Sequence, residues 1–168
     1  MGWRDMGVPV IAEIHGNCFG AGMQLALGAD IRIARPDAKF SLMEAKWGLI
    51  PDMGGGALLR ELLPVDVAKE LVMTGRVVSG EQAKALGLIS HVADNPSEHT
   101  QRLLAEILER SPDSVAASKH MMQNIFGLDA DAHLTQERRW QRRLMGFKNQ
   151  RLSVAKHSVK DKVVAFVK

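Results

Sequence analysis

A glycine-rich segment between a strand-like run and a helix-like run constrains this chain more than any other feature. Residues 8–14 are short, β-branched and bounded by glycine, and residues 23–27 are good helix formers. Between them, Gly20-Ala21-Gly22 permits close backbone approach and unusual dihedral angles. A strand that turns sharply into a helix points the first N–H groups of that helix at one place. The segment therefore predicts either a tight turn without a ligand or a site for an anion, or for an oxygen that becomes one.

Strand-like and helix-like runs alternate through the first half of the chain. We expect strands at residues 8–14, 30–34, 39–43 and 88–92, and helices at residues 22–28, 58–63, 65–74 and 79–87. The last of these helices begins with Ser79 and Gln82 at the spacing of a capping box. This alternation favours an α/β fold with mostly parallel strand pairing.

The second half of the chain is predicted to be helical. Helices are expected to start at Asn95-Pro96 and at Ser111-Pro112, and a third is expected at residues 130–148. The third carries many arginines and only a narrow apolar stripe, which fits docking onto a neighbour better than burial in one core. We therefore divide the chain into an α/β core at residues 1–94 and a helical oligomerisation region with a tail at residues 95–168.

Composition and charge exclude several function classes. The 168 residues suffice for one domain with a real core, and no apolar run is long enough to span a membrane. The only cysteine, Cys18, cannot form an internal disulfide, which suits a reducing compartment such as the cytoplasm. The net charge is +3, and residues 148–168 hold six lysines and arginines against one aspartate, without aromatic residues interleaved for stacking. We therefore expect neither a nucleic-acid nor a membrane partner. The basic stretch is a solvated face, or a contact to ligand phosphates or to a partner subunit.

Two carboxylates in the first half are candidates for chemistry. Glu44 follows a strand-like run among apolar neighbours, so it is either a surface charge or a base in an apolar pocket, where a carboxyl exchanges protons more readily near neutral pH. Asp52 precedes Met53 and three glycines, so it either caps the next helix or acts as a second acid. The histidines lack metal-ligand spacing, and Cys18 has no base partner nearby, so we predict no metal and no cysteine nucleophile.

Short motifs recur along the chain in a defined order. They are PVIAxIHG at residues 9–16, FGAGM at 19–23, ADIRIA at 29–34, AKFSxxE at 38–44, GLIPxxGG at 48–55, TGR at 74–76, AxxLGL at 83–88 and SP…AxK at 111–119. Together they resemble the crotonase (enoyl-CoA hydratase/isomerase) superfamily over roughly residues 8–126. The resemblance implies the crotonase-like (ClpP/crotonase) spiral ββα core, truncated at its N-terminus, followed by a helical C-terminal region.

The resemblance implies that the glycine-rich turn binds the thioester oxygen of an acyl-CoA substrate. By position, the backbone N–H of Ala21 is the donor to that oxygen, and Glu44 is the acid and base that moves a proton next to the thioester. Asp52 matches an aspartate that dienoyl-CoA isomerases of the family carry as a second acid. The implied substrate-binding residues are Gly20, Gly22, Gln24, Met43, Met53 and Gly54. No cofactor is implied, because the coenzyme A thioester is itself the substrate.

Gln24 departs from the family pattern. Hydratases of the family commonly use two glutamates, and the first of them falls at Gln24 here, whereas the second falls at Glu44. An amide cannot exchange a proton usefully near neutral pH, so the sequence favours an isomerase that shifts a double bond through a thioester enolate, with an enoyl-CoA hydratase as an alternative. Dienoyl-CoA isomerases also carry an acid at the position of Gln24, so the match to them is partial.

The family normally has a further βαβ portion before the strand at residues 9–14. That portion supplies the other oxyanion N–H and much of the CoA site, and this sequence lacks it. A second hypothesis is therefore a non-catalytic crotonase-like subunit that binds acyl-CoA or serves in assembly. Because family members assemble as trimers or paired trimers, the resemblance also implies a homotrimer or a dimer of trimers.

Overall fold

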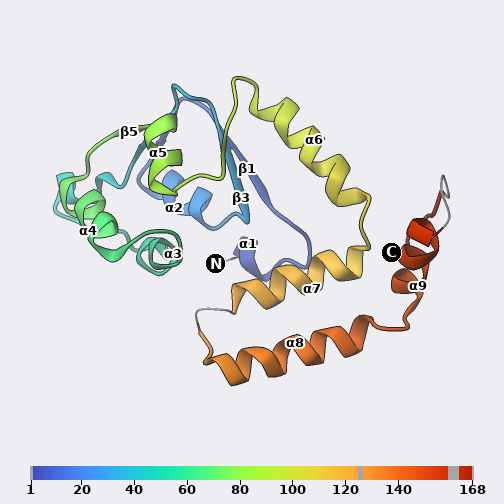
Figure 1. Cartoon of the computed structure of the whole chain (residues 1–168). Coiled ribbons are helices and arrows are strands. Elements are labelled where there is room, and N and C mark those ends of the chain that lie inside the picture. The colour runs from blue at the N-terminus through green and yellow to red at the C-terminus, as the bar shows by residue number, and fades with distance from the viewer. Residues whose placement is uncertain (1, 125–126, 159–162, 168) are drawn as a thin grey trace. The chain divides into compact units, whose positions relative to one another are not determined.

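The computed structural model describes residues 2–124, 127–158 and 163–167 (Figure 1). They fall into two compact units. The N-terminal unit comprises Val10–Arg102 with the residues up to Met6, and the C-terminal unit comprises Gly7–Pro9 with Leu103–Lys168. The boundary lies within helix α6 (Pro96–Leu108), and the domain boundary expected at residue 94 stays a prediction. Within the described ranges, no helix is long and apolar enough to cross a membrane.

Three parallel strands form the first sheet of the N-terminal unit. Strand β1 (Ile11–Ile14) pairs with β3 (Ile31–Ala34), which pairs in turn with β6 (His91–Val92). Ile11 lies opposite Ile31 in this register. The connection from β1 to β3 contains the glycine-rich turn, and the connection from β3 to β6 contains Glu44.

A second small sheet holds the glycine-rich segment in place. Strand β2 (Asn17–Phe19) pairs in parallel with β4 (Lys39–Ser41), and β4 pairs antiparallel with β5 (Val78–Ser79). Beyond the last pair, the Gly20 N–H donates to the Ser41 carbonyl at 2.9 Å. The pairing therefore brings the start of the glycine turn next to the chain that leads into Glu44.

The helices of the N-terminal unit begin and end at residues suited to helix termini. Helix α4 (Val65–Thr74) follows Pro64 and ends at Gly75, as predicted. Helix α5 (Gly80–Leu86) has the predicted capping box, with both the Ser79 and the Gln82 bonds present. The remaining helical segments of the unit are α1 (Gly2–Asp5), α2 (Ala21–Leu27), the 3₁₀ helix η1 (Met43–Trp47) and α3 (Gly55–Leu62).

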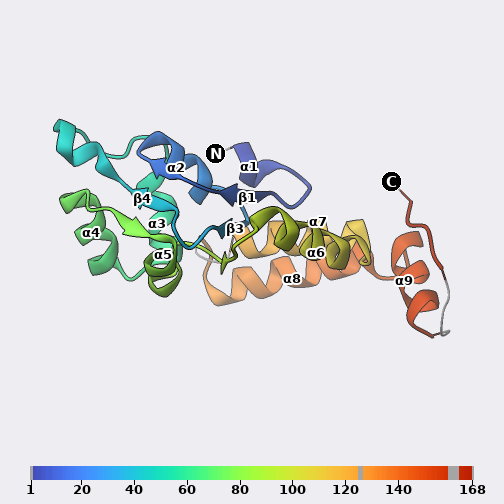
Figure 2. The same ribbon diagram turned by 90° about the horizontal axis from the view of Figure 1, so that it is seen from above.

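An apolar core fixes these segments against one another. Helix α2 packs against β2 and α3, and α4 packs against α3 and η1. Helices α3 and α4 lie side by side in both views (Figures 1 and 2). Each large apolar side chain that leaves water stabilises the folded unit by about 1.5–3 kcal/mol. The best-buried members of the core include Met23, Phe40, Leu42, Leu59, Val78 and Leu88. Met23 and Leu42 are near neighbours in sequence of Gln24 and Glu44, so the core anchors both candidate site residues.

The C-terminal unit is helical, as predicted. Helix α7 (Pro112–Gln123) runs antiparallel to α8 (Ala130–Leu144) and also contacts α9 (Lys148–Ser158) (Figure 1). The side chain of Ser111 caps α7 by accepting from the Ser114 N–H, and Asp129 caps α8 by accepting from the Ala132 N–H.

Three predicted strand boundaries are wrong. The strand expected at residues 88–92 starts only at His91, because the Leu88 N–H still donates to the Ala83 carbonyl at the end of α5. The strand expected at residues 8–14 starts only at Ile11, because Pro9 has no N–H and the Val10 N–H donates to the Asp30 carboxylate at 2.7 Å. The strand expected at residues 39–43 ends at Ser41, because the chain turns into η1 at Met43.

Two predicted helices also differ from the structure. The helix expected at residues 58–63 starts earlier, at Gly55, since Gly54 takes the left-handed backbone conformation that precedes it. The helix expected at residues 130–148 ends at Leu144, and Gly146, with φ of 80°, separates it from α9. Of the apolar stripe expected on one long helix, Trp140 and Leu144 lie on α8, whereas Phe147 lies in the turn before α9.

Candidate active site

The glycine-rich turn forms the junction between β2 and α2. Gly20 has φ of 51° and ψ of −122°, a conformation that side chains other than glycine rarely adopt. Ala21 and Gly22 open the helix and are exposed, and no side chain caps this helix start. Helix geometry leaves their N–H groups without an acceptor inside the helix. The turn can therefore offer backbone N–H groups to an oxygen of a bound molecule.

Gln24 lies one turn further along α2, where its buried amide joins three segments. Its Nε2 donates to Oε1 of Glu44 on η1 at 2.7 Å. Its Oε1 accepts from the backbone N–H of Met53 at 2.8 Å and of Gly55 at 3.1 Å. This network fixes the orientation of the amide, because a flipped amide would set its NH₂ against two N–H donors and its oxygen against a carboxylate.

The Glu44 carboxylate lies beside the glycine-rich turn. A Cβ atom built on Gly20 would stand 3.5 Å from Oε1 of Glu44 and 4.0 Å from Cγ of Met43. Oε2 of Glu44 is buried and has no hydrogen-bond partner among the described residues. Leaving such an oxygen unpartnered destabilises a fold by about 1–3 kcal/mol, and exceptions of this kind call for an explanation such as a catalytic role.

The structure separates the two alternatives for Asp52 in part. The N-cap of α3 is Gly54, with φ of 90° and no side-chain cap, so the predicted capping role of Asp52 is wrong. The Asp52 side chain is exposed, and the next residue, Met53, is the one whose N–H binds Gln24. The segment thus brings Asp52 to the edge of the site, and its role as a second acid stays a prediction.

An apolar hollow of about 510 Å³ opens beside Gln24. Large side chains that are about half exposed line it, which is typical of a surface kept for a ligand or a partner. The lining residues besides Gln24 and Met53 are Gly2, Trp3, Met6, Leu25, Gly28 and Leu58. Sequence reasoning missed this set, because α1 is too short to give a periodic pattern and Leu25 alone resembles an ordinary helix residue.

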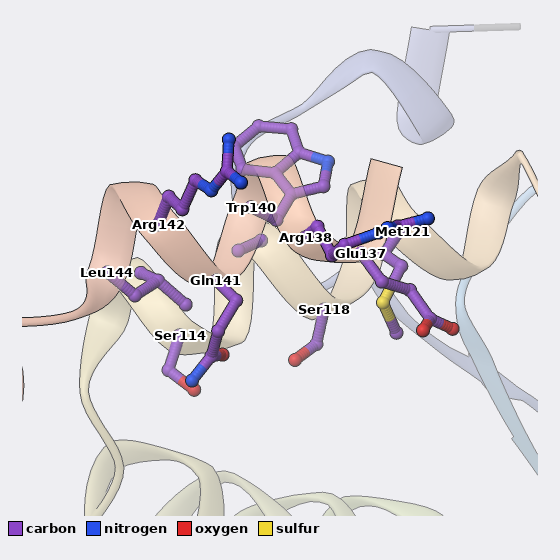
Figure 3. Close-up of a pocket in the computed structure, with 10 residues that line it drawn as sticks. Ser114, Ser118, Met121, Glu137, Arg138, Trp140, Gln141, Arg142 and Leu144 are labelled. Atoms are coloured by element: carbon purple, nitrogen blue, oxygen red, sulfur yellow. The ribbon is translucent and has the colours of Figure 1, made fainter. Parts of the chain in front are cut away.

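A second hollow, of about 580 Å³, lies in the C-terminal unit between α7 and α8. Figure 3 shows Ser114, Ser118 and Met121 on one wall and Trp140 and Gln141 among the residues of the other. The Trp140 ring stacks on His120 with centroids 5.7 Å apart, and Arg143 lies over its face at 5.1 Å. Both serines are exposed to water, whereas Gln24 is buried and Glu44 is half-buried.

Cys18 is not a candidate nucleophile. Its side chain lies in the apolar core, and burial raises the pKa of the thiol to about 11. The thiol is therefore protonated near neutral pH, and the thiolate is the reactive form. Of the candidate residues, the structure brings Gln24 and Glu44 together beside Gly20.

Comparison with known sequences identifies relatives of this arrangement. A family model described as enoyl-CoA hydratase/isomerase matches residues 2–163. A carnitinyl-CoA dehydratase of Salmonella typhi is 39% identical over 119 residues, which is 70% of this chain and 46% of the relative. The chain thus spans about half the length of the curated relatives that it matches.

Solved structures give the same result at the level of the fold. An enoyl-CoA hydratase from Polaromonas sp. JS666 matches 94% of this chain with a TM-score of 0.88 and 30% identity, and 62% of its own chain is covered. A protein from Thermobifida fusca YX, described as an enoyl-CoA hydratase and solved with CoA, matches 84% of this chain with a TM-score of 0.80 and 31% identity, over 56% of its own length. These matches confirm the predicted crotonase-like fold.

Proposed function

Because this chain belongs to the enoyl-CoA hydratase/isomerase family, we propose that it supplies an acid–base residue and an oxyanion donor to a site for acyl-CoA thioesters. The observation that carries the proposal is the Glu44 carboxylate, held by one oxygen beside the glycine-rich turn. Ala21 is the proposed oxyanion donor, because its N–H opens α2 at this turn. Gly20, Gly22 and Met43 are proposed to contact the thioester from the same side.

The proposed reaction begins with proton removal next to the thioester. Glu44 takes a proton from C2, and the electron pair of the broken C–H bond moves into the thioester as an enolate. The negative charge that develops on the thioester oxygen is stabilised by the Ala21 N–H, an effect worth a few kcal/mol for such donors. Glu44 then returns the proton at C4, which converts a 3-enoyl-CoA into a 2-enoyl-CoA with no net change in atoms or electrons. No cofactor takes part in this scheme.

The apolar hollow beside Gln24 supports an acyl group as part of the substrate. Its half-exposed lining of Trp3, Met6, Leu25 and Met53 suits a hydrocarbon chain better than a charged group. Gln24 borders both this hollow and Glu44, so an acyl chain in the hollow approaches the carboxylate.

A second candidate function is the removal or addition of water. The name of the carnitinyl-CoA dehydratases favours it. In that reaction Glu44 would take the C2 proton and return it to the hydroxyl that leaves C3 as water. Gln24 argues against this second function, because its amide cannot accept or donate the proton near neutral pH as a second carboxyl could.

One set of absorbance assays separates the candidates. The chain is offered 2-enoyl-, 3-enoyl- and 3,5-dienoyl-CoA, with Glu44→Gln as the control. We expect conversion of a 3-enoyl or 3,5-dienoyl substrate, slowed about 100-fold or more in Glu44→Gln. Hydration of the 2-enoyl substrate would favour the second candidate. Binding of all three without turnover would favour the non-catalytic subunit.

The same preparation tests the proposed assembly. We propose a homotrimer or a dimer of trimers, and sedimentation equilibrium measures the mass in solution directly. A monomer over the whole concentration range would contradict it.

A further inference from the structure

The contact between Gln24 and Glu44 has a direction that the structure defines. The two backbone donors on Oε1 of Gln24, from Met53 and Gly55, leave only Nε2 to face the carboxylate. Nε2 can donate and cannot accept, so the bond to Glu44 requires a carboxylate oxygen that accepts. Gln24 is therefore the donor and Glu44 the acceptor in this contact.

A glutamate at position 24 would act differently at the same place. It could keep the bonds to Met53 and Gly55 through one oxygen, and its other oxygen would then stand where Nε2 now lies, 2.7 Å from Oε1 of Glu44. Two carboxylates at that distance cannot both be ionised, so they would share a proton. With Gln24, no shared proton is needed, because the amide Nε2 supplies the hydrogen for the bond to Glu44.

The two oxygens of Glu44 consequently differ in their surroundings. Oε1 is occupied by Gln24, whereas Oε2 is buried without a partner among the described residues. Since Oε2 is covered, a substrate carbon reaches it only when the atoms beside it move aside. A buried oxygen with an unused lone pair, in a carboxylate fixed through its other oxygen, has the properties required of a proton acceptor.

Resting on the proposed function, we propose that Gln24 is a positioning residue, which fixes the Glu44 carboxylate through Oε1 and leaves Oε2 to accept the substrate proton. When the C2–H bond breaks, the O–H bond forms at Oε2 and the electron pair remains on the substrate as the enolate. The same proton later leaves Oε2 for the product carbon. Gln24 itself exchanges no proton, and its hydrogen bond to Oε1 lasts through both steps.

The test compares two variants of Gln24 in the full chain with 3-enoyl-CoA as the substrate. Gln24→Glu keeps an acceptor for Met53 and Gly55 and changes only the atom that faces Glu44. Gln24→Met keeps the side-chain length and removes all three bonds. Gln82→Glu, on the exposed capping box of α5, makes the same chemical change away from the site. The readouts are kcat and KM for isomerisation, with circular dichroism to verify folding.

We expect both Gln24 variants to lower kcat at least tenfold while KM changes less than about threefold, and Gln82→Glu to match the wild type. A role confined to holding Met53 and Gly55 would leave Gln24→Glu at the wild-type kcat, and that result would overturn the inference while the proposed function stands. A wild-type chain that binds the thioester but neither isomerises it nor exchanges its C2 proton would contradict the proposed function and the inference together. If Gln24→Met fails to fold, the kcat of Gln24→Glu compared with that of Gln82→Glu still tests whether Gln24 positions Glu44.

Discussion

At the scale of single residues, Gly55 is the most restricted position of the candidate site. A Cβ atom there would stand 2.9 Å from Oε1 of Gln24 and 3.0 Å from Cβ of Pro51. Its N–H also binds the same Gln24 oxygen. The glycine is therefore required by close approach, and any side chain at this position would push the amide that holds Glu44.

Gly55→Ala should disturb both stability and activity. We expect the free energy of unfolding to fall by about 1–3 kcal/mol, the usual effect of an overpacked site, and turnover of 3-enoyl-CoA to slow. Gly56→Ala is the matched control, because a Cβ on Gly56 meets nothing within 4 Å and this residue also lies in α3. That variant should gain about 0.5–1 kcal/mol through better helix propensity. Urea denaturation measures both, and equal effects at the two glycines would contradict the account.

The sequence predicted Gln24 and Glu44 as site residues but not the hydrogen bond between them. Glu44 and Gln24 were identified from ordered motifs, and both occupy the N-terminal unit beside the glycine turn. Their hydrogen bond depends on where Met53 and Gly55 place their N–H groups, and that placement follows from a loop with no periodic pattern. The apolar hollow was missed for the same reason, since Trp3 and Leu58 meet only in the folded unit.

At the scale of elements, Arg32 of β3 links the C-terminal end of α2 to the segment that leads into β6. Its side chain is buried, and its guanidinium donates to the carbonyls of Ala29 at 2.5 Å, Leu88 at 2.8 Å and Leu27 at 3.3 Å. Burial lowers the pKa of Arg32, and the nearby Asp30 opposes this shift. The cation thus satisfies carbonyls at the end of α2, where a positive charge is favourable.

Arg32→Met should therefore destabilise the N-terminal unit. The variant keeps much of the apolar volume but leaves three carbonyls without their donor, so we expect a loss of about 3 kcal/mol. Arg32→Lys retains a charge but not the planar set of donors, and its loss should be smaller. Guanidinium denaturation followed by circular dichroism measures both variants. A methionine variant as stable as the wild type would show that these hydrogen bonds make no net contribution to the free energy of unfolding.

The sequence predicted best those helices whose ends are marked by residues close together in the chain. The capping box of α5 and the proline and glycine that bound α4 depend on residues a few positions apart, and both predictions are confirmed. Strands β2 and β5 have three and two residues, and they form only through pairing with β4. This pairing joins residues far apart in the chain, so the sequence of such a short strand does not predict it.

At the scale of the whole molecule, the C-terminal unit depends on a contact between distant parts of the chain. Glu109, after α6, forms an ion pair with Lys156 on α9. The hydrogen bond from Lys156 is the main cause that lowers the pKa of Glu109 below its ordinary value of 4.5. A lowered carboxyl pKa gives stability that is present above pH 4.5 and is lost as the pH falls through the pKa of the folded state.

Lys156→Met tests this contribution. At neutral pH and low salt, we expect the variant to unfold at a lower urea concentration than the wild type. The difference should shrink as the pH falls through the folded-state pKa of Glu109, and also in 1 M salt, which screens exposed charges. Urea titrations at pH 7 and pH 3 provide the comparison. A difference that persists unchanged at pH 3 would assign the effect to packing of the Lys156 stem.

The fold class was predictable from ordered motifs over roughly residues 8–126, whereas the arrangement of the last helices was not. Ordered motifs gave the crotonase-like class, and solved relatives confirm it. The break between α8 and α9 escaped prediction, because Gly146 within a run of helix-forming residues is a weak signal until its left-handed conformation is known. The chain covers about six-tenths of the solved relatives, so the activity of the whole protein rests on the proposals above.

Incorporation of solvent deuterium at C2 of a saturated acyl-CoA tests the central claim most directly. Such a substrate can neither isomerise nor take up water, so the exchange reports enolate formation alone. We expect the wild-type chain to incorporate deuterium and Glu44→Gln to do so at least about 100-fold more slowly, as measured by mass spectrometry. Equal rates in the two proteins, or no incorporation by a folded chain that binds the thioester, would contradict the role of Glu44 as the base.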